Sequence, residues 1–408
     1  MALEVRPIEP EELERFGRVN LTAFGEKWDA WHRSWFEQRV IPANTMAAYD
    51  DGALVGSSMM FEVEVGIPGG RERAAGVTAV GVLPTHRRRG IMRSMLDRLL
   101  AEANRRGYSL AVLWASEGGI YSRFGFGPAA QGLRVELEHP KARLLPFPAS
   151  GTMRLITHDD ARRAFPAVHA ELVDRCPAMI ARDDAAWDFA LSEEDPHVTR
   201  EEGPMFFLVH EDEGRPDGYL VYRIRNKWSA RGPENTLVIL EMVGHSGLVT
   251  RDLWRYCTEV DLVRRIEASG RGLRPSDDPI PWLAADPQAL LASRATTLWA
   301  DVLDVRKFLE RRRYRVDGQL SLEVRGDSPA TTTTLRLSVD HGRGHCQPAE
   351  GPADLSLGRD DLGAISLGQE CIPQLVLAGR ARARSDAVAR LANGIFGWSP
   401  APWCFEDI

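Results

Sequence analysis

The spacing of apolar positions changes along the first 150 residues, and these changes predict a mixed α/β unit. In the segment 88–106 the apolar residues recur at intervals of 4, 3, 1 and 3, which places them on one face of a helix. These residues are Met92, Leu96, Leu99, Leu100 and Ala103. Gly107 ends this helix, and the apolar run 108–115 predicts a buried strand. Strands are also expected over residues 45–49, 54–65 and 74–83, so a strand–loop–helix–strand unit lies at the centre of this section.

A similar order of elements returns in the middle of the chain, and a different order follows it. Residues 151–293 predict a helix, three strands and a second helix, which roughly repeats the first section and suggests an internal duplication. Residues 294–408 alternate strands and helices in an α+β pattern. We therefore expect three domains, 1–150, 151–293 and 294–408. The fold class is α/β with α+β character, built on mixed central sheets.

Composition and charge narrow the class of partner. Apolar residues make up 44% of the 408-residue chain and charged residues 27%, as is usual for soluble globular proteins. The formal net charge of −7 argues against nucleic acid as a partner and suits a cationic substrate. The five cysteines form no C-x-x-C pair, which disfavours a disulfide framework or a zinc site. Because no apolar run approaches ~18 residues and the first residues are acidic and polar, we expect a cytoplasmic protein without a membrane span.

The segment 78–92 has the form of an anion-binding site. A valine-rich strand runs into Pro84, three consecutive arginines and Gly90 follow, and a helix begins directly after them. The first turn of a helix presents N–H groups without intrahelical partners, and the helix dipole adds partial positive charge there. Gly90 would let the backbone approach a phosphate closely, and the arginines add full charges. The plainer alternative is a solvated basic patch at a helix start. Neither G-x-x-x-x-G-K-[ST] nor G-x-G-x-x-G occurs here.

This loop resembles the acetyl-CoA motif of the GNAT acetyltransferases, R/Q-x-x-G-x-G/A, which follows a strand splayed from its neighbour. Arg87 to Gly90 match the first half of the motif, whereas Met92 stands where a small residue is usual. The resemblance implies that the backbone of Val80 and Val82 pairs with the pantetheine arm and that residues 87–93 hold the pyrophosphate. The candidate cofactor-binding residues are Val80, Gly81, Val82, Arg87, Arg88, Arg89, Gly90, Ile91, Met92, Arg93, Ser116 and Glu117.

Tyr121 is the candidate general acid. The sequence Y-x-R-F-G-F that begins at Tyr121 resembles the Y-x-x-x-G-F of the GNAT family, where this tyrosine lies near the coenzyme thiol. The alternative is a core tyrosine whose hydroxyl has one backbone partner. A free tyrosine has a pKa near ~10 and a thiol near ~8.5, so proton transfer to the thiolate is uphill unless the site lowers the tyrosine pKa. Hydrogen-bond donation would still stabilise the leaving group.

Taken over the full chain, the sequence resembles the enhanced-intracellular-survival (Eis) acetyltransferases. These combine a GNAT section with the motif, a second without it, and a C-terminal section like a sterol carrier protein. The resemblance implies direct acetyl transfer to aminoglycosides or similar polyamines, a homohexamer, and the α-carboxylate of Ile408 as the catalytic base. The tail 400–408 carries two prolines, Trp403 and Phe405, which predicts that it packs rather than dangles.

The segment 24–36 is the candidate amine-binding region, because it holds three tryptophans and two acids. We expect Glu26, Trp28 and Asp407 to contact substrate, although an amphipathic helix with its aromatic face in the core explains the segment equally well. Protein lysine or N-terminal acetylation remains an alternative activity, and so does lipid binding by the third section. No metal is expected, since the paired histidines 341 and 345 lie in a glycine-rich loop.

Overall fold

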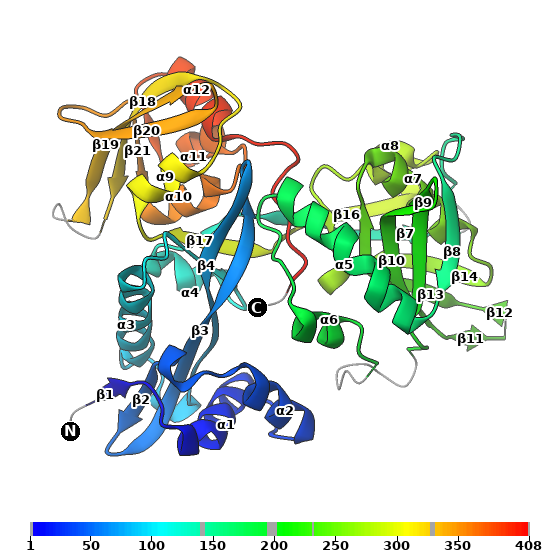
Figure 1. Cartoon of the computed structure of the whole chain (residues 1–408), viewed down its shortest axis with the longest axis horizontal. Helices are drawn as coiled ribbons and strands as arrows, with labels where there is room; N and C mark the ends of the chain where they lie inside the picture. Colours follow the sequence, from blue (N-terminus) through cyan, green and yellow to red (C-terminus); the bar gives the residue numbers. More distant parts are fainter. Residues whose placement is uncertain (1–2, 139–142, 194–201, 231, 327–330, 407–408) are drawn as a thin grey trace.

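The chain folds into three parts, each built on its own β-sheet (Figure 1). The computed structural model describes residues 3–138, 143–193, 202–230, 232–326 and 331–406. Within these ranges the three main sheets have seven, eight and five strands, and each mixes parallel with antiparallel pairs. The expected mixed architecture is therefore confirmed.

The first sheet has the order β1-β2-β3-β4-β5-β17-β6. Its strands are β1 (Glu4–Arg6), β2 (Ala47–Asp50), β3 (Ala53–Ile67), β4 (Gly70–Val82), β5 (Leu110–Trp114), β17 (Leu298–Val302) and β6 (Gly127–Pro128). Its helices are α1 (Leu13–Phe24), α2 (Ala30–Arg39), α3 (Ile91–Arg105) and α4 (Gly118–Tyr121).

Helix α3 forms where its apolar spacing predicts, and its buried face is slightly rotated. Leu96, Leu99, Leu100 and Ala103 are buried as expected, and Ile91 and Met95 join them. Met92, expected on this face, is only half-buried. The buried face packs against the sheet, which fixes the start of the helix beside the end of β4.

The second sheet repeats much of the first. Its path is β15-β7-β14-β13-β10-β9-β8, with β16 also paired to β7. The strands are β7 (Gln131–Glu138), β8 (Thr152–Ile156), β9 (Phe206–Asp212), β10 (Arg215–Arg225), β13 (Asn235–Gly244), β14 (Val263–Ala268), β15 (Arg274–Pro275) and β16 (Leu290–Thr296). The helices are α5 (His158–Arg175), α6 (Asp184–Ala190), α7 (Gly247–Glu259) and α8 (Ile280–Leu283).

Two strands cross the section limits that the sequence suggests. Strand β7 precedes residue 150 but pairs with β14 and β16 in the second sheet. Strand β17 was expected in the third section, yet it lies between β5 and β6 of the first sheet. An apolar run in the sequence identifies a strand but does not show which sheet that strand joins. The sequence therefore did not predict that β7 and β17 belong to sheets of neighbouring sections. The limits at 150 and 293 thus remain predictions, while sheet membership crosses both.

The third part packs directly on the first. Its strands are β18 (Gly318–Arg325), β19 (Thr333–Asp340), β20 (Arg343–Pro348), β21 (Leu355–Gly358) and β22 (Arg382–Ala383). Its helices are α9 (Val305–Arg311), α10 (Arg359–Ser366), α11 (Ile372–Leu377) and α12 (Asp386–Phe396). One apolar core joins this part to the first sheet, because Val112 and Leu298 share it with Leu320 and Phe396. Arg359 also binds buried Asp301 of β17 through two contacts of 2.6 and 2.7 Å.

After α12 the chain leaves the third part and runs to the second, as the red segment of Figure 1 shows. Trp403 and Phe405 are buried in the apolar core of the second part, beside Phe165 and Tyr219. The described part of the tail therefore packs, as its prolines and aromatic residues predicted.

Candidate active site

The first sheet opens between β4 and β5. These parallel strands pair only at Ala75–Ala111 and Gly76–Val112, and β4 then runs on to Val82 without β5 beside it. The expected splayed strand is present. Ala79 holds a left-handed φ of 52° at this point. Its carbonyl accepts a hydrogen bond of 2.9 Å from Ser57, at a register shift between β3 and β4.

Helix α3 begins at the far end of this opening with a geometry suited to an anion. Gly90 has a φ of 77° at the N-cap and supplies no side-chain cap. The N–H groups of the first turn therefore lack an intrahelical partner. A Cβ at Gly90 would meet no heavy atom within 4 Å, so the approach to these groups is open. Gly90 is needed for its backbone angle, which a residue with a Cβ adopts only with strain.

The three arginines before Gly90 have different surroundings. Arg87 donates to the carbonyls of Ala23 at 2.7 Å and Val82 at 3.3 Å, so it joins the end of α1 to the end of β4. Arg89 pairs with Asp50 at 2.8 Å. Among the described residues, Arg88 has neither an ion pair nor a hydrogen bond, and its own φ is 63°. Arg88 thus offers the uncommitted charge of the three.

Tyr121 lies at the end of α4 and lines a cavity of about 500 Å³. Its side chain is buried, and its ring packs edge-on against Phe126. Within residues 3–406 as described, the hydroxyl has no hydrogen-bond partner, unlike the core tyrosine considered above. Burial, with a smaller effect of Glu117, raises the pKa of Tyr121 to about 12. The hydroxyl consequently stays protonated across the physiological range.

Aromatic rings form a large part of the cavity wall. They are Phe24, Trp31, Trp35, Phe36, Trp114 and Phe189, and Val80 and Ser116 also line the cavity. Glu26 supplies a carboxylate, and its Oε2 lies 3.3 Å from Nε2 of His32, another lining residue. Asp29 fixes that imidazole through a 2.8 Å contact to Nδ1. Such a wall attracts cations through ring faces and through carboxylate charge.

The two residues of segment 24–36 that were predicted to contact substrate lie in different surroundings. Glu26 lines the cavity, whereas Trp28 packs in the core between α1 and α2, with its ring 5.5 Å from that of Phe36. A Cβ at Gly17 would collide with the Trp28 ring, which shows how closely the ring approaches α1. For Trp28 the amphipathic-helix alternative gives the better description. Asp407 and Ile408 lie outside the described residues.

The comparisons agree with this geometry. Models described as acetyltransferase (GNAT) domain match residues 4–129 and 178–315, and a sterol carrier protein domain matches residues 305–405. An uncharacterized N-acetyltransferase of Streptomyces griseus is 32% identical over 99% of both chains. The N-acetyltransferase Eis of Mycobacterium bovis is 30% identical over 90% of both. The crystal structure of Eis1 from Mycobacterium abscessus has a TM-score of 0.85 at 26% identity, covering 99% of this chain and 100% of that one.

The chain belongs to the Eis family of GNAT acetyltransferases. This Eis-family protein is therefore an N-acetyltransferase, with tandem GNAT domains and a sterol carrier protein-like domain. The GNAT fold implies that acetyl-CoA is its acyl donor.

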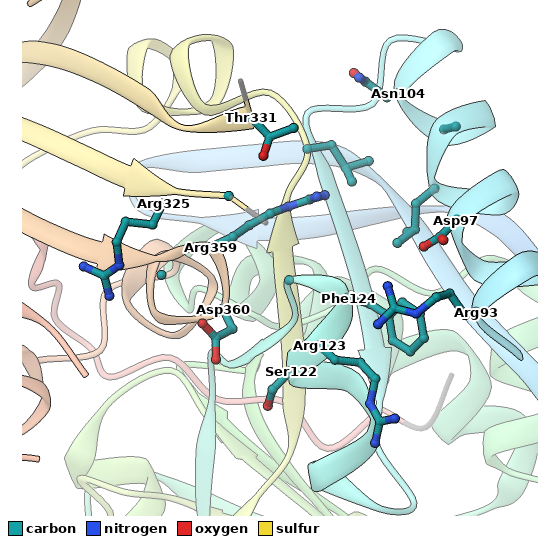
Figure 2. A pocket seen from close by; sticks show the side chains of 16 residues that line it. Arg93, Asp97, Asn104, Ser122, Arg123, Phe124, Arg325, Thr331, Arg359 and Asp360 are labelled. Atoms are coloured by element: carbon teal, nitrogen blue, oxygen red, sulfur yellow. The ribbon is translucent and has the colours of Figure 1, made fainter. Parts of the chain in front are cut away.

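A second cavity, of about 560 Å³, is lined in part by residues 122–125, directly after α4, in this Eis-family enzyme. Figure 2 shows Arg93, Asp97 and Asn104 along α3 on one side and Arg325, Arg359 and Asp360 of the third part on the other. The guanidinium of Arg93 lies 5.4 Å from the centre of the Phe124 ring. The side chain of Arg93 thus faces this second cavity, whereas its backbone belongs to the first turn of α3.

Sequence reasoning missed Phe189 and His32. His32 lies in the aromatic segment that was singled out, but no pattern distinguished it from its neighbours. Phe189 comes from α6 of the second part, and its ring lies 5.6 Å from that of Trp31. A residue supplied by another section leaves no local signal in the sequence of the motif.

Two further observations concern metals and membranes. Among the described residues, ligand atoms of Asp317, Asp340 and His341 lie within 4.8 Å of one another, all on exposed side chains. His345, the other histidine considered, is not part of this group. No described helix has the length and apolar character needed to cross a membrane.

Proposed function

We propose that this enzyme transfers acetyl directly from acetyl-CoA to an amine of a polycationic small molecule, such as an aminoglycoside or a polyamine. The observation that carries the proposal is the aromatic cavity that contains both Tyr121 and Glu26. Several ring faces and a carboxylate suit a ligand with several ammonium groups. The net charge of −7 acts in the same direction over a longer range.

The residues present fit acetyl-CoA. From Val80 to Val82, the edge of β4 that has no β5 beside it offers hydrogen-bonding groups to an amide-containing arm, and the start of α3 offers N–H groups to a pyrophosphate. The first stretch leads toward Tyr121, because Val80 lines the same cavity as that residue. When bound there, acetyl-CoA would supply the activated acetyl group as a thioester.

Tyr121 then acts on the sulfur as a hydrogen-bond donor. With a pKa of about 12 the hydroxyl is fully protonated, and it has no competing partner among the described residues. The same value makes complete proton transfer to a thiolate of pKa ~8.5 unfavourable. Stabilisation of the developing charge by a donated hydrogen bond is the role that this geometry supports best.

A proton acceptor is needed as well, since an alkyl ammonium has a pKa near ~10.4 and only the free amine attacks. We propose the α-carboxylate of Ile408 for this role, as the Eis resemblance implies. Its support is the tail, whose residues 401–406 pack into the second part beside α6, the helix that brings Phe189 to the cavity. His32, hydrogen-bonded to Asp29 and facing Glu26, is the alternative acceptor inside the cavity.

Assembly into a homohexamer and a cytoplasmic location belong to the same proposal. Trp282 and Leu377 are exposed by 84% and 87%, and such large apolar side chains are the candidates for contacts between copies. Light scattering of the wild type and of Leu377→Glu would test the assembly.

The alternative activities predict different substrates. A protein acetyltransferase would use lysine peptides in the same cavity, so only a comparison of substrates separates it from the proposal. Lipid binding by the third part is disfavoured because Leu320, Leu322 and Ile365 already pack in the core shared with the first sheet.

The test is thiol release from acetyl-CoA with aminoglycosides, polyamines and lysine peptides as acceptors. Turnover with the first two, and a KM for them raised several-fold by Glu26→Gln, is expected. Glu37→Gln on α2 is the matched control, because Glu37 is exposed and does not line the cavity. Turnover with peptides alone would replace the substrate class, and failure to bind acetyl-CoA would overturn the whole proposal.

A further inference from the structure

The second sheet opens in the same way as the first. Strands β13 and β14 pair in parallel from Asn235–Val263 to Ile239–Ala268, and β13 then continues to Gly244 without β14 beside it. Helix α7 follows, as α3 follows β4, but the loop 244–247 contains no arginine. The duplicated domain thus keeps the opening without the residues that would hold a pyrophosphate.

The chain itself fills this second opening. Arg274, 2% exposed, donates to the carbonyl of Met242, on the part of β13 that has no β14 beside it, and binds Asp278 at 2.9 Å. Its guanidinium lies 5.2 Å from the centre of the Trp403 ring, whose indole N–H donates to the carbonyl of Leu273 at 2.9 Å. The space that remains is about 290 Å³, and residues 399–401 and 403 form part of its wall. Arg274 and the tail residues thus share the place where the first sheet offers backbone to a cofactor.

Backbone contacts continue along the tail. The amide of Ala401 donates to Asp277 at 3.1 Å, and that of Trp403 donates to the carbonyl of Pro177 at 3.0 Å. Phe405 is buried next to Trp403, with their ring centres 5.0 Å apart. The tail is therefore held at Ala401, Trp403 and Phe405.

The strongest contacts are at Glu406, the last described residue. Arg182 reaches its carboxylate at 2.8 and 3.0 Å, and Nε2 of His169 lies 3.1 Å from Oε1. The side chains of Arg182 and His169 are each 2% exposed. Arg182 also binds Glu241, at 2.8 and 3.1 Å. Burial opposes the charge on Glu406, but Arg182 and His169 outweigh it and lower the pKa of this carboxyl, so Glu406 stays ionised in this pocket.

Helix α6 connects these contacts to the active-site cavity. Trp187 packs against His169, with ring centres 5.4 Å apart, and the guanidinium of Arg182 lies 4.6 Å from the centre of the Trp187 ring. Two residues further along the helix, Phe189 lines the cavity that contains Tyr121. Helix α6 thus contacts His169 and Arg182, which hold Glu406, and also lines the cavity that contains Tyr121.

We propose that the opening of the second sheet is the binding site of the chain's own C-terminal segment, and that Arg182 and His169, acting through Glu406, are positioning residues for the terminal carboxylate. The proposal rests on the role suggested above for Ile408. A chain spans at most ~3.3–3.6 Å per residue. Because Ile408 is two residues beyond Glu406, fixing Glu406 limits how far the terminal carboxylate can lie from it. The second GNAT domain, which lacks a cofactor loop, thereby contributes to catalysis by positioning the base.

The test compares Glu406→Gln with Glu171→Gln. Both remove a carboxylate that contacts a histidine of the second part, but Glu171 pairs with His245 and makes no ion pair or hydrogen bond with the described part of the tail. General bases contribute ~10²–10⁴-fold, so a partly misplaced base should lower kcat by about tenfold in Glu406→Gln. We expect an unchanged KM for acetyl-CoA, partial recovery of kcat with added formate, and wild-type behaviour for Glu171→Gln.

His169→Gln gives an independent measurement should Glu406→Gln fail to fold. The double variant should lose no more than the worse single variant, because both changes break one contact. Wild-type kcat in folded Glu406→Gln or His169→Gln would overturn the positioning role even if the terminal base is correct. A chain extended beyond Ile408 separates the two ideas: if it remains fully active, the base itself is wrong.

Discussion

Tyr121→Phe is the substitution that tests the chemistry most directly. The phenol has a pKa of about 12, and a thiol has one near ~8.5, so complete proton transfer to the thiolate is unfavourable by roughly 5 kcal/mol. The remaining contribution is that of a hydrogen-bond donor to a developing negative charge, which is typically ~10²–10³-fold in kcat. The ring should keep its contact with Phe126, and none of the described residues loses a hydrogen bond. We therefore expect kcat to fall by this factor while the free energy of unfolding changes by less than ~0.5 kcal/mol.

The assay is the pH dependence of kcat for the wild type and Tyr121→Phe, with thermal denaturation as the folding control. Because burial raises the pKa of Tyr121, its ionisation should cause no loss of activity between pH 7 and pH 10. Near-normal turnover of the variant would remove Tyr121 from the reaction. An alkaline loss of activity near pH 9 that disappears in the variant would instead refute the raised pKa and restore full proton transfer.

The other predictions concern the helix start and the contact between the first and third parts. Gly90→Ala should destabilise the fold by ~1–2 kcal/mol, because its φ is 77°, and should weaken acetyl-CoA binding measured by calorimetry. Gly247→Ala, at the start of α7 with equally open space and no positive φ, should do neither. Arg88→Ala should weaken acetyl-CoA binding by about tenfold or more and Arg89→Ala by less, since Asp50 already neutralises Arg89; equal effects would contradict this order. Burial raises the pKa of Asp301 to about 6 although Arg359 opposes it, so the stability from this group is present below pH 4 and lost as pH rises through 6. Asp301→Asn should flatten this dependence, and unfolding curves at pH 4.5 and pH 7 that change in parallel with the wild type would contradict it.

Local features of the fold followed from the sequence. The arginine loop, Gly90 and Tyr121 belong to one short stretch of chain, where a strand, a turn and a helix each have a distinct spacing of apolar residues. Buried and exposed positions of α3 could be inferred from its period, except at Ile91, Met92 and Met95. Each of these local features depends on residues that are only a few positions apart in the sequence.

Features that combine distant segments could not be inferred. The insertion of β17 between β5 and β6 joins residues almost 200 positions apart, and Phe189 reaches the cavity from another sheet. Trp28 and Trp35 lie in the same aromatic segment of the sequence, yet Trp28 packs against α1 whereas Trp35 lines the cavity. Only the direction of each side chain on the assembled helices separates them.

The two openings also give a reason why the proposed catalytic unit extends beyond the first domain. Residues 1–150 alone would leave β5 without β17, the cavity without Phe189, and the proposed reaction without the tail. An exposed strand edge in place of the β5–β17 pair favours aggregation over folding. The second domain lacks the arginines of a cofactor loop, but its own opening holds Arg274 and Trp403, and through them the segment that leads to Glu406. Loss of the cofactor loop alone does not account for the binding of this tail along residues 401–406. Positioning of the terminal carboxylate, through the buried contacts of Arg182 and His169 with Glu406, does account for it.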